Sequence, residues 1–111
     1  MFERHVARTA RAGVDKMKFL ALERELPTAS AESFKPLLKD EARSVWDMQQ
    51  SGTLREIYFT VDRQTAVLIL ECSDKDMAQH LLAGLPLVQA GLITFDVIPL
   101  VPYDGFARLF V

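Results

Sequence analysis

The chain is poor in the residues from which metal sites and disulfides are built. Its 111 residues include one cysteine and two histidines. A lone cysteine excludes a disulfide within the chain and a structural zinc site with two or more cysteine ligands. His80 has no second histidine nearby, because His5 lies in the amino-terminal tail. We therefore expect no metal site, and the unpaired Cys72 favours a reducing, cytoplasmic location.

Long apolar runs, phosphate-binding glycine loops and an excess of positive charge are also missing. No stretch of about 18 apolar residues exists, so no membrane-spanning helix is expected. The sequence has no P-loop, no dinucleotide-binding glycine motif and no serine nucleophile elbow. The formal net charge is -2, whereas nucleic-acid binding requires a basic stripe or patch. Organic cofactors, nucleic acids and membranes are therefore not expected partners.

Half of the residues are apolar and a quarter are charged, which is typical of one globular domain. Residues 1–16 hold four Lys and Arg against two acids, and we expect them to form a basic, flexible amino-terminal extension. Residues 17–111 are predicted to form a single domain. Its carboxy-terminal tail, residues 101–111, is so apolar that we expect it to pack, for example on a second subunit.

Hydrophobic periodicity predicts strands at residues 17–25, 54–60, 66–71 and 93–100. Helices are predicted at residues 36–51 and from about residue 74 to 84, where Gly84 and Pro86 end the second helix. Pro36 must lie in the first turn of the main helix or separate a short leading turn from it. This order is that of the α+β, ferredoxin-like βαββαβ fold, with a four-stranded antiparallel sheet and both helices on one face.

Both faces of the predicted sheet are apolar, although two helices cover only one of them. The simplest way to bury the second face is to pack it against another sheet. We therefore expect a homodimer or a higher homo-oligomer.

One charged residue stands on the apolar stripe of the main helix. The three- and four-residue steps of a helical face connect Phe34, Leu37, Glu41, Val45 and Met48. An ionised carboxylate among apolar groups must find a partner, face a wet cavity or keep its proton near neutral pH. A raised pKa also suits a proton-transfer catalyst. Glu41 is therefore the candidate catalytic residue.

Two structural alternatives for Glu41 stay open at this point. The carboxylate is paired with Arg55 or Arg43 in a structural ion pair, or the helix is rotated so that Ala42 takes the core position.

Chain geometry suggests which residues lie near Glu41. If Gly52 is the turning point, Glu41 lies about 16 Å back along the helix, a level that the next strand reaches near Ile57 or Tyr58. We therefore expect Arg55 and Tyr58 to be substrate-binding candidates in a cleft between helix and sheet. Strand alternation turns these two side chains to opposite faces unless a bulge intervenes, so only one of them is expected beside Glu41.

Two further side chains complete the predicted substrate-binding set. Trp46 lies one turn from Glu41 and supplies a rigid aromatic wall, a common feature of ligand pockets. His80 falls between the apolar positions Met77 and Leu81 of the second helix, where it is either a rim histidine or a site residue.

Several landmarks in residues 17–101 together resemble the muconolactone delta-isomerase family. Asp40 and Glu41 stand twelve and eleven residues before Gly52, and Thr53 and Arg55 follow at the head of the next strand. The remaining landmarks are Leu85, Pro86 and Leu87 before the last strand, and Asp96 within it.

The resemblance implies a dimeric α+β barrel that isomerises an unsaturated lactone in bacterial aromatic catabolism. Family members move a proton between carbons without a metal or an organic cofactor. Glu41 would be the general acid/base, and Arg55 would bind the lactone carboxylate through its planar guanidinium. Leu54 and Glu56 depart from the family pattern.

Since this fold serves several functions, two alternatives to the isomerase stay open. One is a non-catalytic dimeric module that binds a small ligand or assembles subunits, and the other is a cofactor-free monooxygenase.

Overall fold

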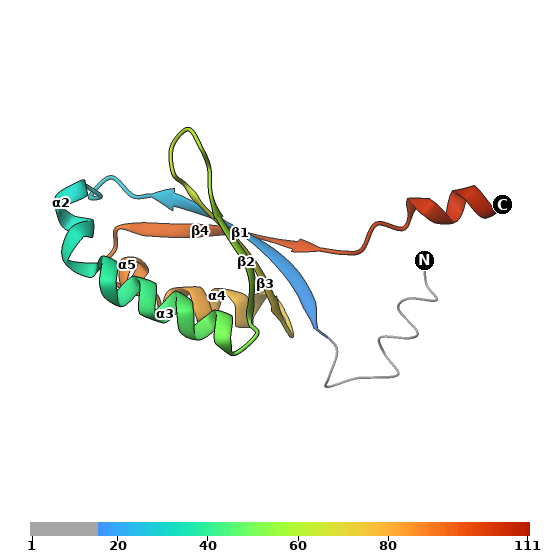
Figure 1. Ribbon diagram of the computed structural model, residues 1–111, viewed down its shortest axis with the longest axis horizontal. Helices are drawn as coiled ribbons and strands as arrows, with labels where there is room; N and C mark the ends of the chain where they lie inside the picture. Colours follow the sequence, from blue (N-terminus) through green and yellow to red (C-terminus); the bar gives the residue numbers. More distant parts are fainter. Residues whose placement is uncertain (1–15) are drawn as a thin grey trace.

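The computed structural model describes residues 16–111 and shows a four-stranded sheet with helices on one of its faces (Figure 1). The strands are β1 (Met17–Glu25), β2 (Leu54–Phe59), β3 (Ala66–Cys72) and β4 (Ile93–Leu100). Their order in the sheet is β2-β3-β1-β4, and every neighbouring pair is antiparallel. The predicted ferredoxin-like fold class is confirmed. The predicted amino-terminal extension lies outside the described residues, except for its last residue, Lys16.

The first helical segment is longer and more divided than the sequence predicts. It consists of α2 (Ala31–Phe34), the 3-10 turn η1 (Lys35–Leu37) and α3 (Leu38–Gln50). Ser30 starts it with a reciprocal capping box, in which the Ser33 backbone N–H donates to Ser30 Oγ. Pro36 lies in η1, so of the two predicted placements the separate leading turn is the correct one.

The second helical segment contains a short helix that the sequence did not predict. Asp74 Oδ1 accepts a hydrogen bond from the Met77 backbone N–H at 2.8 Å and caps α4 (Lys75–Ala83). Gly84 follows as its carboxy-terminal cap. Pro86 was expected only to end the helix, but it also begins α5 (Pro86–Gln89), because proline suits the first turn of a helix.

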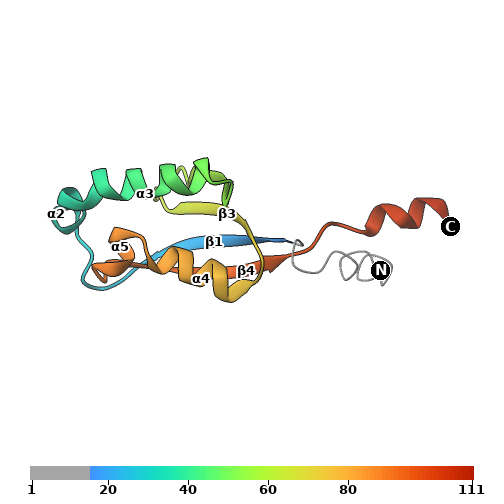
Figure 2. The ribbon, with the colours of Figure 1, turned by 90° about the horizontal axis from the view of Figure 1, so that it is seen from below.

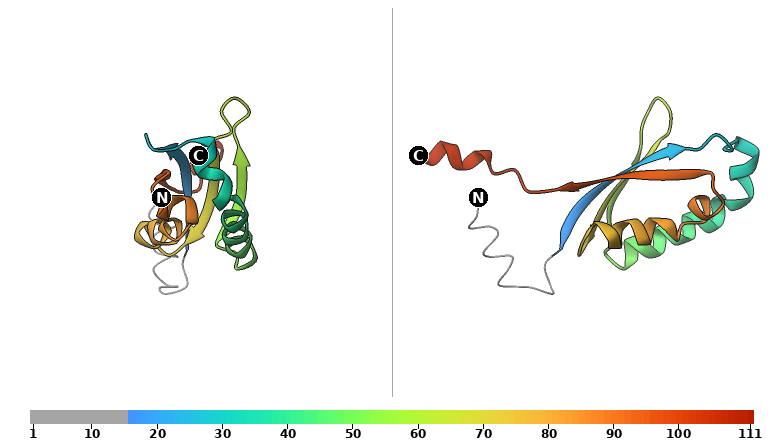
Figure 3. Two further views of the ribbon diagram at one scale, coloured as in Figure 1. Left: turned by 90° about the vertical axis from the view of Figure 1, so that its left-hand side faces the viewer. Right: turned by 180° about the vertical axis from the view of Figure 1, so that it is seen from behind.

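The helices cover different parts of the same sheet face. α3 packs against β2, whereas α4 packs against β3 and β4. Figure 2 shows α3 running along one side of the molecule and α4 and α5 along the other. The end-on view in Figure 3 shows that both lie on the same side of the sheet. No helix among residues 16–111 is long and apolar enough to cross a membrane.

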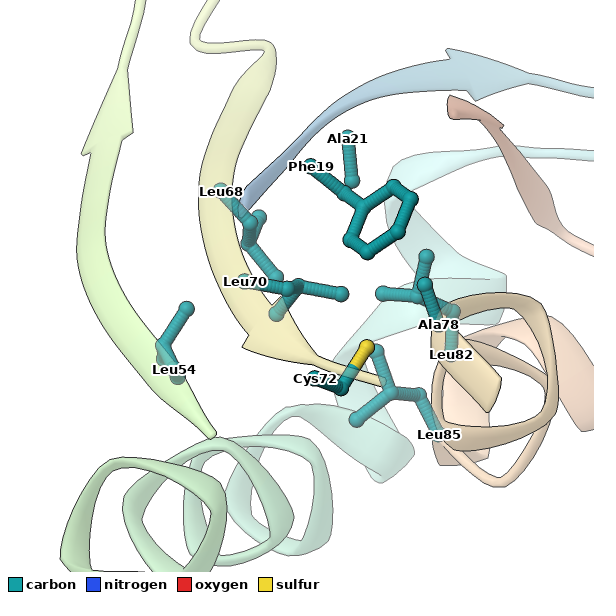
Figure 4. Packing of buried hydrophobic residues seen from close by; sticks show 9 residues of the cluster. All are labelled: Phe19, Ala21, Leu54, Leu68, Leu70, Cys72, Ala78, Leu82 and Leu85. Atoms are coloured by element: carbon teal, nitrogen blue, oxygen red, sulfur yellow. The ribbon is translucent and has the colours of Figure 1, made fainter. Parts of the chain in front are cut away.

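The main core lies between the two central strands and α4 (Figure 4). Phe19 of β1 and Leu70 of β3 lie opposite each other in the sheet and are almost completely buried. Ala78 and Leu82 of α4 close the core from the helix side. By contrast, α3 contributes no fully buried residue. Its inner face therefore packs only partly against the core and also borders a space.

The opposite sheet face carries no helix. Leu20 of β1 lies there between Ile69 of β3 and Ile98 of β4. The carboxy-terminal 3-10 helix η2 (Gly105–Phe110) projects away from the sheet (Figure 1), and Phe110 is 85% exposed. This part of the tail is therefore not buried by the sheet and helices of residues 16–100, and its packing on a second subunit stays a prediction.

Leu70 provides a test of the core. Replacing Leu70 by Ala removes a fully buried side chain from a central strand and should lower the free energy of unfolding by about 2–5 kcal/mol. Val61→Ala is the control, because Val61 is fully exposed in the hairpin turn and should change stability by no more than about 0.5 kcal/mol. Denaturant unfolding of both variants measures the difference. Equal stabilities would contradict the described core.

Candidate functional site

A cavity of about 340 Å³ lies between α3 and the sheet. α3 contributes six lining residues, which are Leu38, Glu41, Ala42, Val45, Trp46 and Gln49. The floor comes from side chains on the helix-facing side of all four strands, and Leu85 and Leu87 close one wall. The lining is mostly apolar and contains a few polar groups, which is typical of a small-molecule pocket.

Glu41 projects from α3 into this cavity and is fixed by one backbone hydrogen bond. Its Oε1 accepts from the N–H of Leu87 at 2.9 Å, at the start of α5. Burial raises the pKa of the Glu41 carboxyl, the Leu87 hydrogen bond partly lowers it, and the negative charge of Glu23 raises it further. The Glu41 pKa is therefore shifted upward, toward the range in which a carboxyl can both accept and donate a proton.

Neither of the two structural alternatives for Glu41, an arginine ion pair or a rotated helix, agrees with the structure. Among the described residues, neither Arg55 nor Arg43 forms an ion pair with Glu41. The helix is not rotated to place Ala42 in the core, because Ala42 is exposed to the cavity side whereas Glu41 is half-buried.

Glu23 is a second cavity carboxylate, which is not among the residues predicted from the sequence. It follows Phe19 and Ala21 on the helix-facing side of β1, and its Oε1 accepts from the Ala66 backbone N–H at 2.7 Å. The signal was present in the alternation, because the third residue of this inward series is charged. The apolar character of residues 19–22 on both faces of the strand obscured it.

A β-bulge in β2 overturns the expected position of Arg55 and Tyr58. The register shifts between Leu54, which pairs with Leu70, and Glu56, which pairs with Ile69. The strand therefore gains one residue, and Arg55 joins Glu56 and Tyr58 on the open face.

Side-chain contacts agree with this placement. Arg55 Nε lies 3.6 Å from Glu71 Oε1, and Tyr58 donates to Glu56 Oε1 at 2.6 Å. Neither Arg55 nor Tyr58 lines the cavity. The expected cleft shared with Glu41 is wrong for both residues, whereas Ile57 and Phe59 from the same strand do line it.

The remaining candidates lie at different places. Trp46 lines the cavity and is 59% exposed, so it forms part of the rim. His80 is exposed on α4 and does not line the cavity. Cys72 is buried in the core, and burial raises its thiol pKa. Within residues 16–111, no group of three or more His, Cys, Asp and Glu side chains is placed to hold a metal ion.

The fold and the cavity define a class of protein, namely a ferredoxin-like α+β protein with a small-molecule pocket that contains carboxyl groups. Comparison with known families makes this more specific. The family model for muconolactone delta-isomerase matches residues 17–105, so the chain belongs to the muconolactone delta-isomerase family. Proteins of this family act on small molecules. No curated protein matches the chain.

The raised pKa of Glu41 predicts a particular pH dependence of stability. A carboxyl whose folded-state pKa exceeds its unfolded value stabilises the fold at low pH and loses this contribution as pH rises through the folded pKa. The free energy of unfolding of the wild type should therefore fall relative to that of Glu41→Gln as pH rises above about 4.5. Gln keeps an oxygen acceptor for the Leu87 N–H.

Denaturant unfolding between pH 4 and 8 measures this difference (~0.5 pH steps suffice). Asp47→Asn, exposed on the same helix and outside the cavity, is the control for removal of one acidic group. A gap between wild type and Glu41→Gln that does not change with pH would contradict the raised pKa.

Proposed function

We propose that the protein is a cofactor-independent isomerase of the muconolactone isomerase type, which shifts a double bond in a small lactone, carbonyl or carboxylate compound by moving a proton. The observation that carries this proposal is a half-buried carboxyl with a raised pKa, held in a mostly apolar cavity. Membership in the family supports the same reaction class.

The geometry of Glu41 suits a carboxyl that both takes and returns a proton. Oε1 is held by the Leu87 N–H, and no residue in the range 16–111 donates a hydrogen bond to Oε2. In the proposed reaction, the Glu41 carboxylate removes a proton from the carbon next to the substrate carbonyl. The electron pair of that C–H bond forms a dienolate. The Glu41 carboxylic acid then returns the proton to the far carbon, and the double bond has moved with no change in composition.

Two side chains of α3 are suited to the oxygen on which charge develops. Trp46 and Gln49 lie three residues apart on one helical face and both line the cavity. The indole and amide N–H groups are donors, and donors aimed at a developing enolate oxygen stabilise the transition state. In this proposal, these two side chains bind the carbonyl oxygen while Glu41 transfers the proton.

Glu41→Gln tests the proposed catalysis. The protein is incubated with lactones and enol-lactones in deuterated water, and NMR follows both double-bond migration and incorporation of deuterium. General acid–base catalysis contributes about 10²–10⁴-fold to a rate, so the variant should lose at least about a hundredfold of both signals. It should remain folded, and Asp47→Asn should retain the wild-type rate. A folded Glu41→Gln variant with wild-type exchange would contradict the catalytic role.

The competing non-catalytic module predicts a closed core around Glu41 with a tight arginine pair. Instead, Glu41 shares a cavity with Trp46 and the hairpin residue Phe59, and Arg55 is paired with Glu71. These observations favour a ligand pocket and support the isomerase over a purely structural module.

We further propose that the protein is a cytoplasmic homodimer, or a higher oligomer built from it, in which the helix-free sheet faces pack together. Leu20, Ile69 and Ile98 form an apolar stripe on this face, and water contact with such a stripe is unfavourable. Packing the two sheets against each other would bury it.

Light scattering coupled to size exclusion tests the assembly. The wild type should have at least the mass of a dimer. Ile98→Asp should shift it toward the monomer, because Ile98 is 46% exposed in the single chain and a charge there opposes sheet packing. Val61→Asp in the hairpin turn is the matched control and should keep the wild-type mass. A monomeric wild type would contradict the proposal.

A further inference from the structure

The ionisable side chains that line the cavity are both acids. Glu23 reaches it from the sheet and Glu41 from α3, and Gln49 is the neutral amide among otherwise apolar or aromatic lining residues. No Lys or Arg in the described part of the chain lines this cavity. Within residues 16–111, the cavity lining therefore offers a carboxylated ligand two acidic groups and no cationic side chain.

The β2–β3 hairpin has two arginines, Arg55 and Arg63, and neither lines the cavity. Arg55 is turned to the open sheet face, where it pairs with Glu71 at 3.6 Å. Arg63 lines two adjoining surface depressions, and in both of them it is accompanied by Glu23 and Glu25. One of these depressions shares four lining residues with the cavity, so the positive charge of Arg63 lies beside two acids at the edge of the cavity and not among its lining residues.

Electrostatics in such a cavity discriminates strongly against a second anion. An ionised carboxylate loses hydration on entering an apolar space. Its repulsion by a like charge a few ångströms away is stronger there than in water, because the effective dielectric constant is lower. A neutral lactone or ketone meets neither penalty. Its ring contacts the apolar walls, and its carbonyl oxygen accepts from donors such as the Gln49 amide.

We infer that the cavity selects an uncharged substrate, such as an unsaturated lactone or ketone without a free carboxylate, and that Glu23 is the residue that rejects anionic analogues. This inference rests on the proposed function, because it names the substrate class of the same cavity. Glu23 is positioned for this role by its hydrogen bond from the Ala66 N–H at 2.7 Å, which holds its charge at the cavity floor.

Binding rather than turnover tests the inference. The probes are γ-carboxymethyl butenolide, its methyl ester and γ-methyl butenolide, so that the ester separates the effect of charge from the effect of size. The fluorescence of Trp46, the single tryptophan of the chain and part of the cavity lining, reports binding. Measurements with the Glu41→Gln variant keep the ligands unreacted.

At pH 7 the ester and the methyl lactone should bind at least about tenfold more tightly than the free carboxylate, since two like charges in a site of reduced dielectric repel by more than about 1.4 kcal/mol. Glu23→Gln should reduce this preference at least about threefold. Its amide oxygen still accepts from Ala66, so the fold is kept. Arg63→Ala should leave the preference unchanged.

Two results would overturn the inference. One is a free carboxylate that binds as tightly as its ester. The other is carboxylate binding that is lost in Arg63→Ala, which would place the substrate carboxylate on that side chain. The proposed catalysis is tested by a different measurement, because it depends on the rate of proton exchange and not on the preference among ligands. If the ester binds more tightly than the carboxylate but no proton exchange is observed, the inferred ligand class stands and the proposed isomerase activity is rejected.

Discussion

The hydrogen bond from the Leu87 N–H to Glu41 Oε1, 2.9 Å long, fixes the cavity carboxyl at the place where the two helical segments meet, since α3 and α5 contact each other. It connects α3, from the first half of the fold, to the start of α5, from the second half. The bond gives a helix-start N–H an acceptor and gives a half-buried carboxyl a fixed position. Without it, the Glu41 carboxyl would have no hydrogen-bond donor under the helix, and Glu23 on the sheet would be the one cavity acid that a backbone N–H holds among the described residues.

The Glu41 carboxyl that this bond holds lies in the cavity beneath α3. α4 closes tightly on the central strands, with Ala78 and Leu82 fully buried, whereas α3 buries no residue completely. Val45 packs on the edge of the core and also borders the cavity, whereas Leu38 lines the cavity and is 51% exposed. Such side chains have fewer dispersion contacts than a filled core would provide. The same sheet thus has one helix that stabilises the fold and one that encloses a site, a pattern expected where function is maintained at some cost in stability.

Much of the architecture was predictable because strand and helix periodicity agree with burial. β4 (Ile93–Leu100) has the predicted bounds, and the helical stripe that contains Glu41 is indeed half-buried. The orientation of β2 was not predicted, because a strand read with strict alternation hides an inserted residue. Leu54 and Ile57 are three positions apart and face the same side, which is the signal of the bulge. Glu23 was missed because strand β1 is apolar on both faces over residues 19–22, so the inward-facing residues could not be distinguished from the outward-facing ones.

The bulge has a consequence for how such a protein diverges. In the six-residue strand β2, Ile57 and Phe59 belong to the cavity, while Arg55 and Tyr58 belong to the outer surface. Substitutions on one side leave the other side unchanged, since the backbone of the sheet separates them. Ligand preference and surface recognition can therefore be altered independently within the same short segment.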